Sequence, residues 1–243
     1  MIERRLRKTS HLVVRAGLSY LFTGLLALLF ALPAFSADEK KDEETLKNSA
    51  TVLVDMINGG SIPNNLLTQA KCIIVLPGVK KVGVGIGGSG GRGAMSCRLG
   101  DSFDGKWSAP AMYSIGGASV GIQVGATSTD FVLLVTTDKG VNAVLNDKTK
   151  LGTDATAAAG PGATAQASSV GGADVYTYAR AKGLFAGVSL EGATLHTDKD
   201  ANARVYEKPV TSKEIVRGNA VKTPGAGQPL VSLLDSKIPT HTN

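Results

Sequence analysis

The chain has 243 residues, with 26 Lys and Arg against 20 Asp and Glu, and a formal net charge of +6. The first 37 residues hold five of the basic residues and one acid, so the remainder carries a net charge near +2. The basic balance is therefore no evidence for nucleic-acid binding, and no nucleic acid is expected as a partner. The remainder is long enough for one domain with a hydrophobic core of its own.

The first 37 residues have the order of a secretory signal peptide. Five basic residues (Arg4, Arg5, Arg7, Lys8 and Arg15) precede the apolar stretch Leu18–Leu32, which is short for a membrane span of about 20 residues. Small residues follow, so we expect cleavage near Ser36–Asp38 and a periplasmic or cell-envelope location. An uncleaved N-terminal anchor is the alternative, and the pair Arg4-Arg5 leaves Sec and twin-arginine export open. The expected domains are a signal peptide over 1–37 and a single domain over 38–243.

Two helices are predicted at the start of that domain. Asp38–Glu44 is charged and is expected to be solvated. Apolar residues at helical spacing predict an amphipathic helix over Thr45–Ile57, which Gly59-Gly60 would end. Pro63 can open a second short helix over Asn64–Ala70.

A glycine-rich block between Ala70 and Thr136 predicts a bent sheet. Glycine alternates there with β-branched residues, which suits strands that bend or let another backbone approach closely. The expected strands are Cys72–Leu76, Val82–Ile86, Ala94–Arg98, Tyr113–Gly125 and Phe131–Val135, with Gly87–Gly93 as a glycine-rich turn. We expect a strongly bent antiparallel sheet or a partly closed β-barrel.

The rest of the chain predicts short elements. They are a helix over Asp138–Asn146, a hairpin of Ala173–Arg180 with Leu184–Leu190, and terminal helices over Ala201–Tyr206, Ser212–Arg217 and Pro229–Leu234. By composition alone, the small-residue segment Ala155–Ala167 is typical of a flexible loop. The predicted fold class is α+β, with N-terminal helices, a bent glycine-rich sheet and short C-terminal helices.

Two motifs that suggest a nucleotide or calcium site lack the sequence context that such a site needs. Gly83–Gly88 matches G-x-G-x-x-G, but no helix-forming run follows it to receive a pyrophosphate. Asp198–Asn202 resembles the start of a calcium loop, but Ala203 and Pro209 stand where that loop needs Gly and Glu. A turn that caps the following helix is the preferred interpretation. No metal site and no cofactor are expected.

Two G-x-S-x-G matches raise the alternative of a serine hydrolase. Ser89 or Ser119 would be the nucleophile, with Asp174 and His196 as partners. That signature works only at a strand-to-helix elbow, and both matches lie in a stretch rich in glycine and serine. We therefore expect no catalytic residues and no enzyme.

The two cysteines, Cys72 and Cys97, both fall in predicted strands. In an exported protein they could form a disulfide, and two small buried thiols are the alternative.

Six basic residues are candidates for an anionic ligand site. They lie at the turns and edges of the predicted sheet: Lys80, Lys81, Arg92, Arg98, Arg180 and Lys182. Such residues are commonly solvated or serve to blunt a sheet edge. The functional interpretation is that they and nearby glycine-rich backbone amides cradle phosphate.

Several segments resemble the SYLF domain family. They are Lys106–Pro110 (KWSAP), Gly121–Gly125 leading into Thr129–Val132, Arg92-Gly93 with Ser96–Arg98, Tyr176–Arg180, and Gly183–Gly192 (GLFAGVSLEG), the most specific match. The resemblance runs from about Thr45 to Arg217. It implies that Ala155–Ala167 belongs to the β part of the fold.

The resemblance also implies a non-enzymatic module that acts at membrane surfaces. Eukaryotic members bind phosphoinositides and, in some fungi, actin filaments, whereas bacterial members are envelope or secreted proteins with a lipid-binding role. The sequence departs from the eukaryotic members in showing no SH3 or FYVE module. Phosphoinositides and actin are not expected partners, because the chain resembles the exported bacterial members. The expected function is binding of anionic lipid at a membrane surface of the cell envelope. The alternative is a structural or protein-interaction module that uses its apolar glycine-rich sheet.

Overall fold

The computed structural model describes residues 32–161, 172–181, 183–218 and 220–238. The predicted signal peptide therefore lies almost wholly outside the described residues. Helix α2 (Leu32–Asn58) crosses the boundary between two compact units, 1–41 and 42–243. In the first unit, Lys41 Nζ lies 3.3 Å from Asp38 Oδ1 one helical turn away. All further description concerns the second unit.

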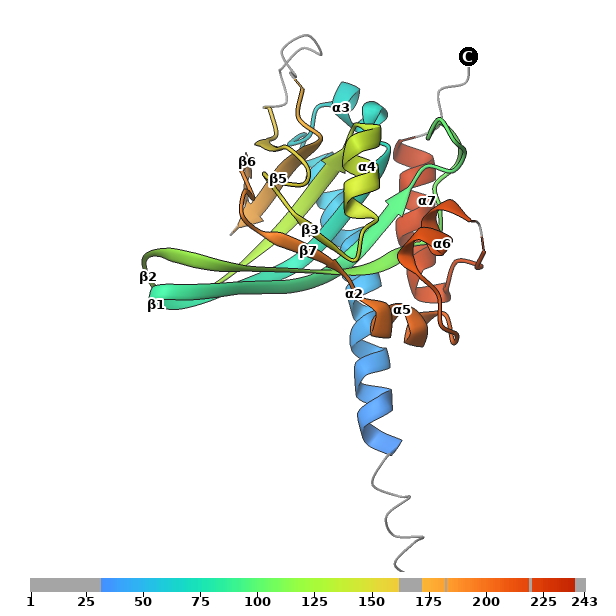
Figure 1. Ribbon diagram of the computed structural model, residues 1–243, viewed down its shortest axis with the longest axis horizontal. Helices are drawn as coiled ribbons and strands as arrows, with labels where there is room; N and C mark the ends of the chain where they lie inside the picture. Colours follow the sequence, from blue (N-terminus) through green and yellow to red (C-terminus); the bar gives the residue numbers. More distant parts are fainter. Residues whose placement is uncertain (1–31, 162–171, 182, 219, 239–243) are drawn as a thin grey trace, which may run out of the picture. The chain divides into compact units, whose positions relative to one another are not determined.

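The centre of the fold is a long two-stranded ribbon (Figure 1). Strand β1 (Cys72–Cys97) pairs antiparallel with β2 (Ala111–Val135), from Cys72 opposite Val135 to Met95 opposite Ala111. The register shifts between Gly83 and Gly85, in the middle of β1, which marks a bulge there.

This ribbon folds back, so that the two ends of β1 meet. Arg98 N–H donates to the Lys71 carbonyl at 2.8 Å, and Cys72 and Cys97 are joined as a disulfide. Glycine is required where the halves touch, because a Cβ at Gly93 would collide with the carbonyl oxygen of Val75. The prediction of a turn over Gly87–Gly93 is therefore wrong: these glycines lie within a strand that packs against its own first half.

The remaining strands attach to the free edge of β2. Strand β5 (Val175–Ala181) pairs with Asp130–Val135, and β7 (Thr194–Thr197) pairs with Tyr113–Gly116. Three short strands complete the sheet: β3 (Lys148–Lys150) beside β7, and β4 (Ala157–Ala159) and β6 (Leu184–Gly187) beside β5. The β4–β5 pair is parallel, so the strongly curled sheet is mixed rather than purely antiparallel. Strand β4 also falls within the segment that the family resemblance assigns to the β part.

Both faces of the sheet are buried along Cys72–Leu76. Ile73 and Val75 pack in a core with α2, α3 (Asn64–Gln69) and α7 (Gln228–Lys237). Ile74 and Leu76 point the other way, into a second core with α4 (Asp138–Val144) and α6 (Ser212–Arg217). Alternate residues of a strand point to opposite faces, which explains why Cys72–Leu76 is wholly apolar. The α+β class is confirmed.

The helix ends follow ordinary capping chemistry. Asp198 accepts a hydrogen bond from the Ala201 amide at 3.0 Å and caps α5 (Lys199–Val205), as the sequence predicts. Thr211 and Glu214 form a reciprocal capping box at the start of α6, whose bounds match the predicted helix. The short 3₁₀ turn η2 (Gly225–Gly227) leads into α7.

Candidate functional site

An open groove of about 900 Å³ lies between the β1–β2 ribbon and the β5–β6 hairpin. Its large side chains are mostly apolar and come from both strand pairs and from the segment after β6: Val79, Ile115, Phe131, Leu184, Val188 and Leu190. Phe131, Leu190 and Ala193 also pack against the second core. The inner wall of the groove is therefore a part of the hydrophobic core that is left open.

The groove exists because the edge of β2 is only partly covered. Strand β5 stops at Asp130 and β7 begins at Gly116. Between them, β1 pairs with one edge of 117–129, and no strand among the described residues pairs with the opposite edge. Thr127, Ser128 and Thr129 line the groove along this open edge. Their backbone and hydroxyl groups give an otherwise apolar groove one polar side.

Strand β6 carries two exposed apolar side chains, one of which lines the groove. Leu184 is 78% exposed and Phe185 is 37% exposed, and they are the large hydrophobic residues that stand out as exposed in the described part of the chain. Leu184 also lines the groove. Exposed apolar surface that is continuous with a groove is typical of interaction sites.

Two of the six predicted site residues, Lys80 and Lys81, lie beside this groove. Lys80 is exposed, and its Nζ donates to Ser128 Oγ at 3.2 Å. Lys81 is half-buried and lines the groove opposite Thr127 in the strand register. Within the described residues, neither ammonium group has a carboxylate at ion-pair distance.

Arg180 lies at the nearby end of β5, but its charge is neutralised. Its guanidinium contacts Asp130 Oδ2 at 2.8 Å and also pairs with Asp55 of α2. Burial acts to lower the pKa of Arg180, and the hydrogen bonds with the two carboxylates outweigh it and raise that pKa. This side chain joins α2 to the sheet rather than facing an empty site.

Arg92 takes part in a different, buried ion-pair cluster. It lies 2.7 Å from Asp42 and 2.9 Å from Asp198, and Arg204 lies 2.7 Å from the other oxygen of Asp42. Asp42 has no solvent exposure, so the prediction that Asp38–Glu44 is solvated is wrong at this residue. The cluster joins α2, β1 and α5.

Arg98 is also structural, because it is buried at the end of β1. Its guanidinium stacks on the Trp107 ring at 4.6 Å and donates to the carbonyls of Ala70, Gly105 and Ile238. Burial lowers the pKa of Arg98, while the carboxylates of Asp235 and Asp104 act in the opposite direction. Trp107, from the KWSAP segment, also donates to the Ile238 carbonyl at 3.0 Å, so Arg98 and Trp107 together hold the end of α7.

The structure does not gather the six predicted cations on one surface. Lys80 and Lys81 lie together with Arg180 nearby, across β2. Arg92 and Arg98 are used in packing, because each compensates buried polar groups contributed by distant parts of the chain. Lys182 lies outside the described residues.

The residues weighed for a hydrolase are engaged in other interactions. Both oxygens of Asp174 accept hydrogen bonds, one from Thr137 and the other from Thr156. Burial acts to raise the pKa of Asp174, but these bonds and that from Lys139 lower it. Ser89 Oγ donates to the Gly117 carbonyl, and His196 lies in β7; the side chain of Ser119 is outside what the structure describes.

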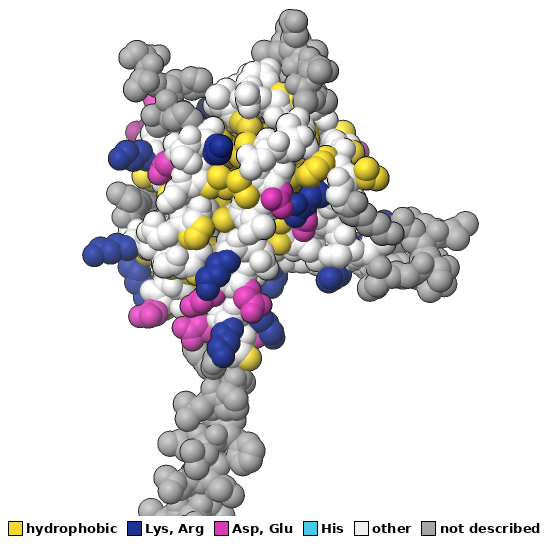
Figure 2. All heavy atoms as spheres, turned by 180° about the vertical axis from the view of Figure 1, so that it is seen from behind, with side chains coloured by type: hydrophobic (Ala, Val, Ile, Leu, Met, Phe, Trp, Pro, Cys, Tyr) yellow, Lys and Arg dark blue, Asp and Glu magenta, His cyan; other side chains and the backbone are white. Residues whose placement is uncertain are grey.

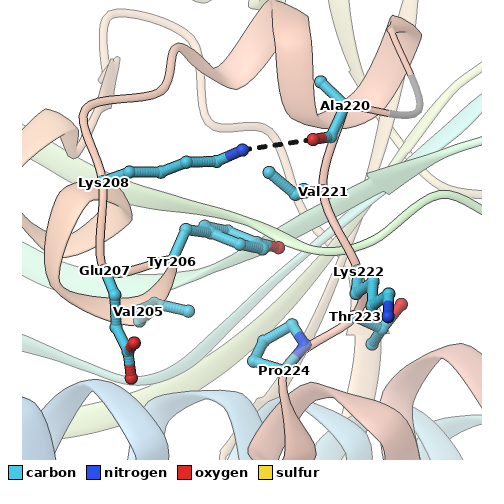
Figure 3. Close-up of a pocket in the computed structure, with 9 residues that line it drawn as sticks. All are labelled: Val205, Tyr206, Glu207, Lys208, Ala220, Val221, Lys222, Thr223 and Pro224. Carbon is cyan, nitrogen blue, oxygen red and sulfur yellow. Dashed lines mark hydrogen bonds between the residues drawn. The ribbon is translucent and has the colours of Figure 1, made fainter.

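A second, smaller hollow of about 460 Å³ lies between the segments 205–208 and 220–224 (Figure 3). Lys208 bridges its two walls by donating to the Ala220 carbonyl at 3.3 Å, and the ring of Tyr206 projects into its middle. The Tyr206 hydroxyl donates to the Pro110 carbonyl at 2.7 Å. The polar side chains of Tyr206 and Lys208 are thus used to hold neighbouring segments together, so this hollow is a weaker candidate for a binding site than the groove.

Charge is mixed on the surface seen in Figure 2. Lys and Arg are interspersed with Asp and Glu, and hydrophobic side chains are visible across the middle of this face. Among the described residues, no group of His, Cys, Asp and Glu is arranged to hold a metal ion. In the same part of the chain, no helix combines the length and the apolar character needed to cross a membrane.

The fold and site together define an α+β domain with an open apolar groove bordered by lysines. The family model described as "Ysc84: Las17-binding protein actin regulator" matches residues 116–237. The chain belongs to this Ysc84 family, which confirms the SYLF resemblance.

Similar proteins come from fungi and animals. The chain is 40% identical over 183 residues to an SH3 domain-containing protein of Schizosaccharomyces pombe, covering 73% of this chain and 41% of that protein. It is 37% identical to protein YSC84 of Saccharomyces cerevisiae, covering 72% and 38%. It is 34% identical to human SH3 domain-containing YSC84-like protein 1, covering 75% and 53%. The chain therefore spans between about two fifths and half of the length of these relatives.

The groove itself is not predictable from the sequence. Its walls come from residues far apart in the chain, such as Val79, Phe131 and Leu190, which look like ordinary core residues in the sequence. One local feature of the sequence does indicate exposed apolar surface. Leu184–Val188 contains no polar residue, so neither face of a strand formed by these residues can be polar.

Proposed function

We propose that this protein binds anionic lipid at a membrane surface, using exposed Leu184 together with Lys80 and Lys81. The carrying observation is that the exposed Leu184 side chain lines the same groove as Lys81, and that neither Lys80 nor Lys81 has a carboxylate partner among the described residues. Leu184 can enter the interface between head groups and acyl chains while the ammonium groups contact anionic head groups. We propose that the protein acts by binding rather than by catalysis.

The size of the effect follows from these three side chains. A lysine near an acidic membrane contributes about 1 kcal/mol, so removing two should weaken binding roughly thirtyfold. Burying a leucine side chain contributes about 2 kcal/mol, so Leu184→Ser should have an effect of similar size. Salt should weaken the contribution of the lysines, because screening acts over about 10 Å at 0.1 M.

The test is co-sedimentation with acidic and with neutral vesicles. We expect Lys80→Ala/Lys81→Ala and Leu184→Ser each to reduce binding to acidic vesicles. The matched control is Lys148→Ala/Lys150→Ala, which removes the same charge from exposed residues of β3. Equal binding by the site variant and the control variant would refute the proposed site. Arg92 is unsuitable for this test, because it is paired with buried Asp42.

A protein-interaction module is the second candidate function. The description of the family names a Las17-binding actin regulator, and the relatives above include proteins named for SH3 domains. A partner that co-purifies with the protein and whose capture is lost in Leu184→Ser, without any binding to vesicles, would favour this function.

We also propose that the protein is exported to the cell envelope after cleavage near Ser36–Asp38. Asp42, which pairs with Arg92 and Arg204, lies downstream of this site and would be kept. Intact-mass measurement of protein from its native host tests the proposal. A mass that retains residues 1–32 would contradict it.

A further inference from the structure

We propose that the groove holds the acyl chain of a single-chain anionic amphiphile, with the head group against Lys81. This inference rests on the proposed function and assigns a ligand class to the groove that adjoins the membrane-binding residues. It differs from surface binding, because the ligand would leave the bilayer and lie inside the protein.

The apolar part of the groove suits a chain without hydrogen-bonding groups. Val79, Ile115 and Phe131 line its wall, which continues the second hydrophobic core. Its volume of about 900 Å³ lies within the roughly 300–1,000 Å³ that small-molecule sites occupy. An acyl chain can lie along this wall without burying an unsatisfied polar group.

The polar groups of the groove give the ligand a direction. Lys81 and the hydroxyl-bearing Thr127, Ser128 and Thr129 belong to the paired β1 and β2 residues beyond the end of β5. Glu191 comes from the segment before β7, where Ala193 lies close to Gly117. An anionic head group is attracted by Lys81 and repelled by Glu191, so it should face the Thr127–Thr129 side.

Lys81 carries the argument for charge complementarity. Its side chain is half-buried in the groove, yet no carboxylate of the described residues pairs with it. Arg92 and Arg180, by contrast, each have two carboxylate partners. A carboxylate or phosphate head group would supply the missing partner and accept hydrogen bonds from the nearby hydroxyls.

The experiment measures how fatty acids displace a fluorescent fatty-acid analogue from the full chain, at concentrations where every ligand is monomeric. Affinity should rise about fourfold for each added methylene group, because each buries further apolar surface. The fatty alcohol of equal length should bind roughly tenfold more weakly, because it lacks the charge that pairs with Lys81. Both comparisons use the unaltered protein, so neither depends on how well a variant folds.

Two variants, each with a matched control, locate the site. Ala186→Trp places a large ring in the groove and should abolish binding, while Ala159→Trp changes an exposed strand alanine outside it and should not. Lys81→Met should remove the preference for acid over alcohol and keep the dependence on chain length. Lys148→Met, at an exposed lysine of β3, should keep both.

Affinity that does not change with chain length, or Ala186→Trp binding like the parent, would overturn the inference. Displacement of the probe by an uncharged extended peptide as effectively as by the fatty acid would overturn it in favour of strand pairing along β2. If acidic vesicles still bind while monomers do not, the groove assignment fails and the proposed function stands. If neither binds, the proposed function fails as well.

Discussion

Reducing the Cys72–Cys97 disulfide should destabilise the protein by about 3.5 kcal/mol. The bond closes a sequence separation of 25 residues, and the chain-entropy relation gives this value for a loop of that length at 25 °C. Both cysteines have no solvent exposure, so reductant should act on them only after unfolding. With a guanidinium m-value of about 4 kcal/mol/M, the unfolding midpoint should fall by roughly 0.9 M.

The assay is guanidinium unfolding of the same protein with and without reductant. This comparison replaces no residue, so no truncated side chain leaves a cavity that contributes to the difference. The m-value should also rise on reduction, because the unfolded chain without its cross-link exposes more surface. Cys72→Ala/Cys97→Ala is the control and should not respond to reductant. Coincident midpoints for the oxidised and reduced protein, or two free thiols in unreduced protein, would refute the reasoning.

Three further changes test the packing. Gly93→Ala should lower the free energy of unfolding by at least about 3 kcal/mol, because the new Cβ would collide with the backbone of the first half of β1. Gly88→Ala is the control: the nearest atom to its Cβ is 4.0 Å away, so the free energy measured by denaturant unfolding should change by less than about 1 kcal/mol. Asp42→Asn should lower the free energy of unfolding by about 3 kcal/mol, because it removes the buried carboxylate that Arg92 and Arg204 share. Asp138→Asn, at an exposed ion pair, should change it by less than about 1 kcal/mol. The pKa of Asp174 is lowered in the folded state, so its ionised form stabilises the protein above the unfolded pKa of about 3.9, and this contribution is lost as pH falls through the folded pKa. Asp174→Asn should therefore reduce the loss of stability at acid pH, measured by denaturant unfolding over a pH series. The same acid-induced loss in the variant and the parent would contradict this role of Asp174.

The elements governed by local chemistry could be predicted from the sequence. The bounds of α6 are reproduced because its cap, Thr211 with Glu214, lies within the helix's own neighbourhood. The strands at both ends of the ribbon were also predictable, since runs such as Cys72–Leu76 are apolar on both faces. Residues 87–93 were misassigned because glycine has a strong local preference for turns, and only the packing of β1 on itself explains their extended conformation.

The candidate site is predictable only in part, because the sequence shows which residues are charged but not which groups each charged side chain contacts. Lys80 and Arg98 look alike in the sequence, as cations close to glycine-rich strands. Arg98 is buried because Trp107 and the carbonyl of Ile238, 140 residues away, surround it. Asp42 looks like one more acid in a charged run, and its two arginine partners lie 50 and 162 residues away in the chain.

The glycines of the ribbon and the open groove have a common origin. A straight β2 could pair with one long strand along its whole edge, and no groove would remain. The folded ribbon turns the two ends of β2 apart, so β5 covers Asp130–Val135 and β7 covers Tyr113–Gly116, and neither reaches 117–129. That fold requires glycine at the contacts of β1 with itself, at Gly91 and Gly93. The glycines therefore do not form a ligand-binding loop. They allow the ribbon to fold back, and this leaves an edge of the sheet open beside Lys81.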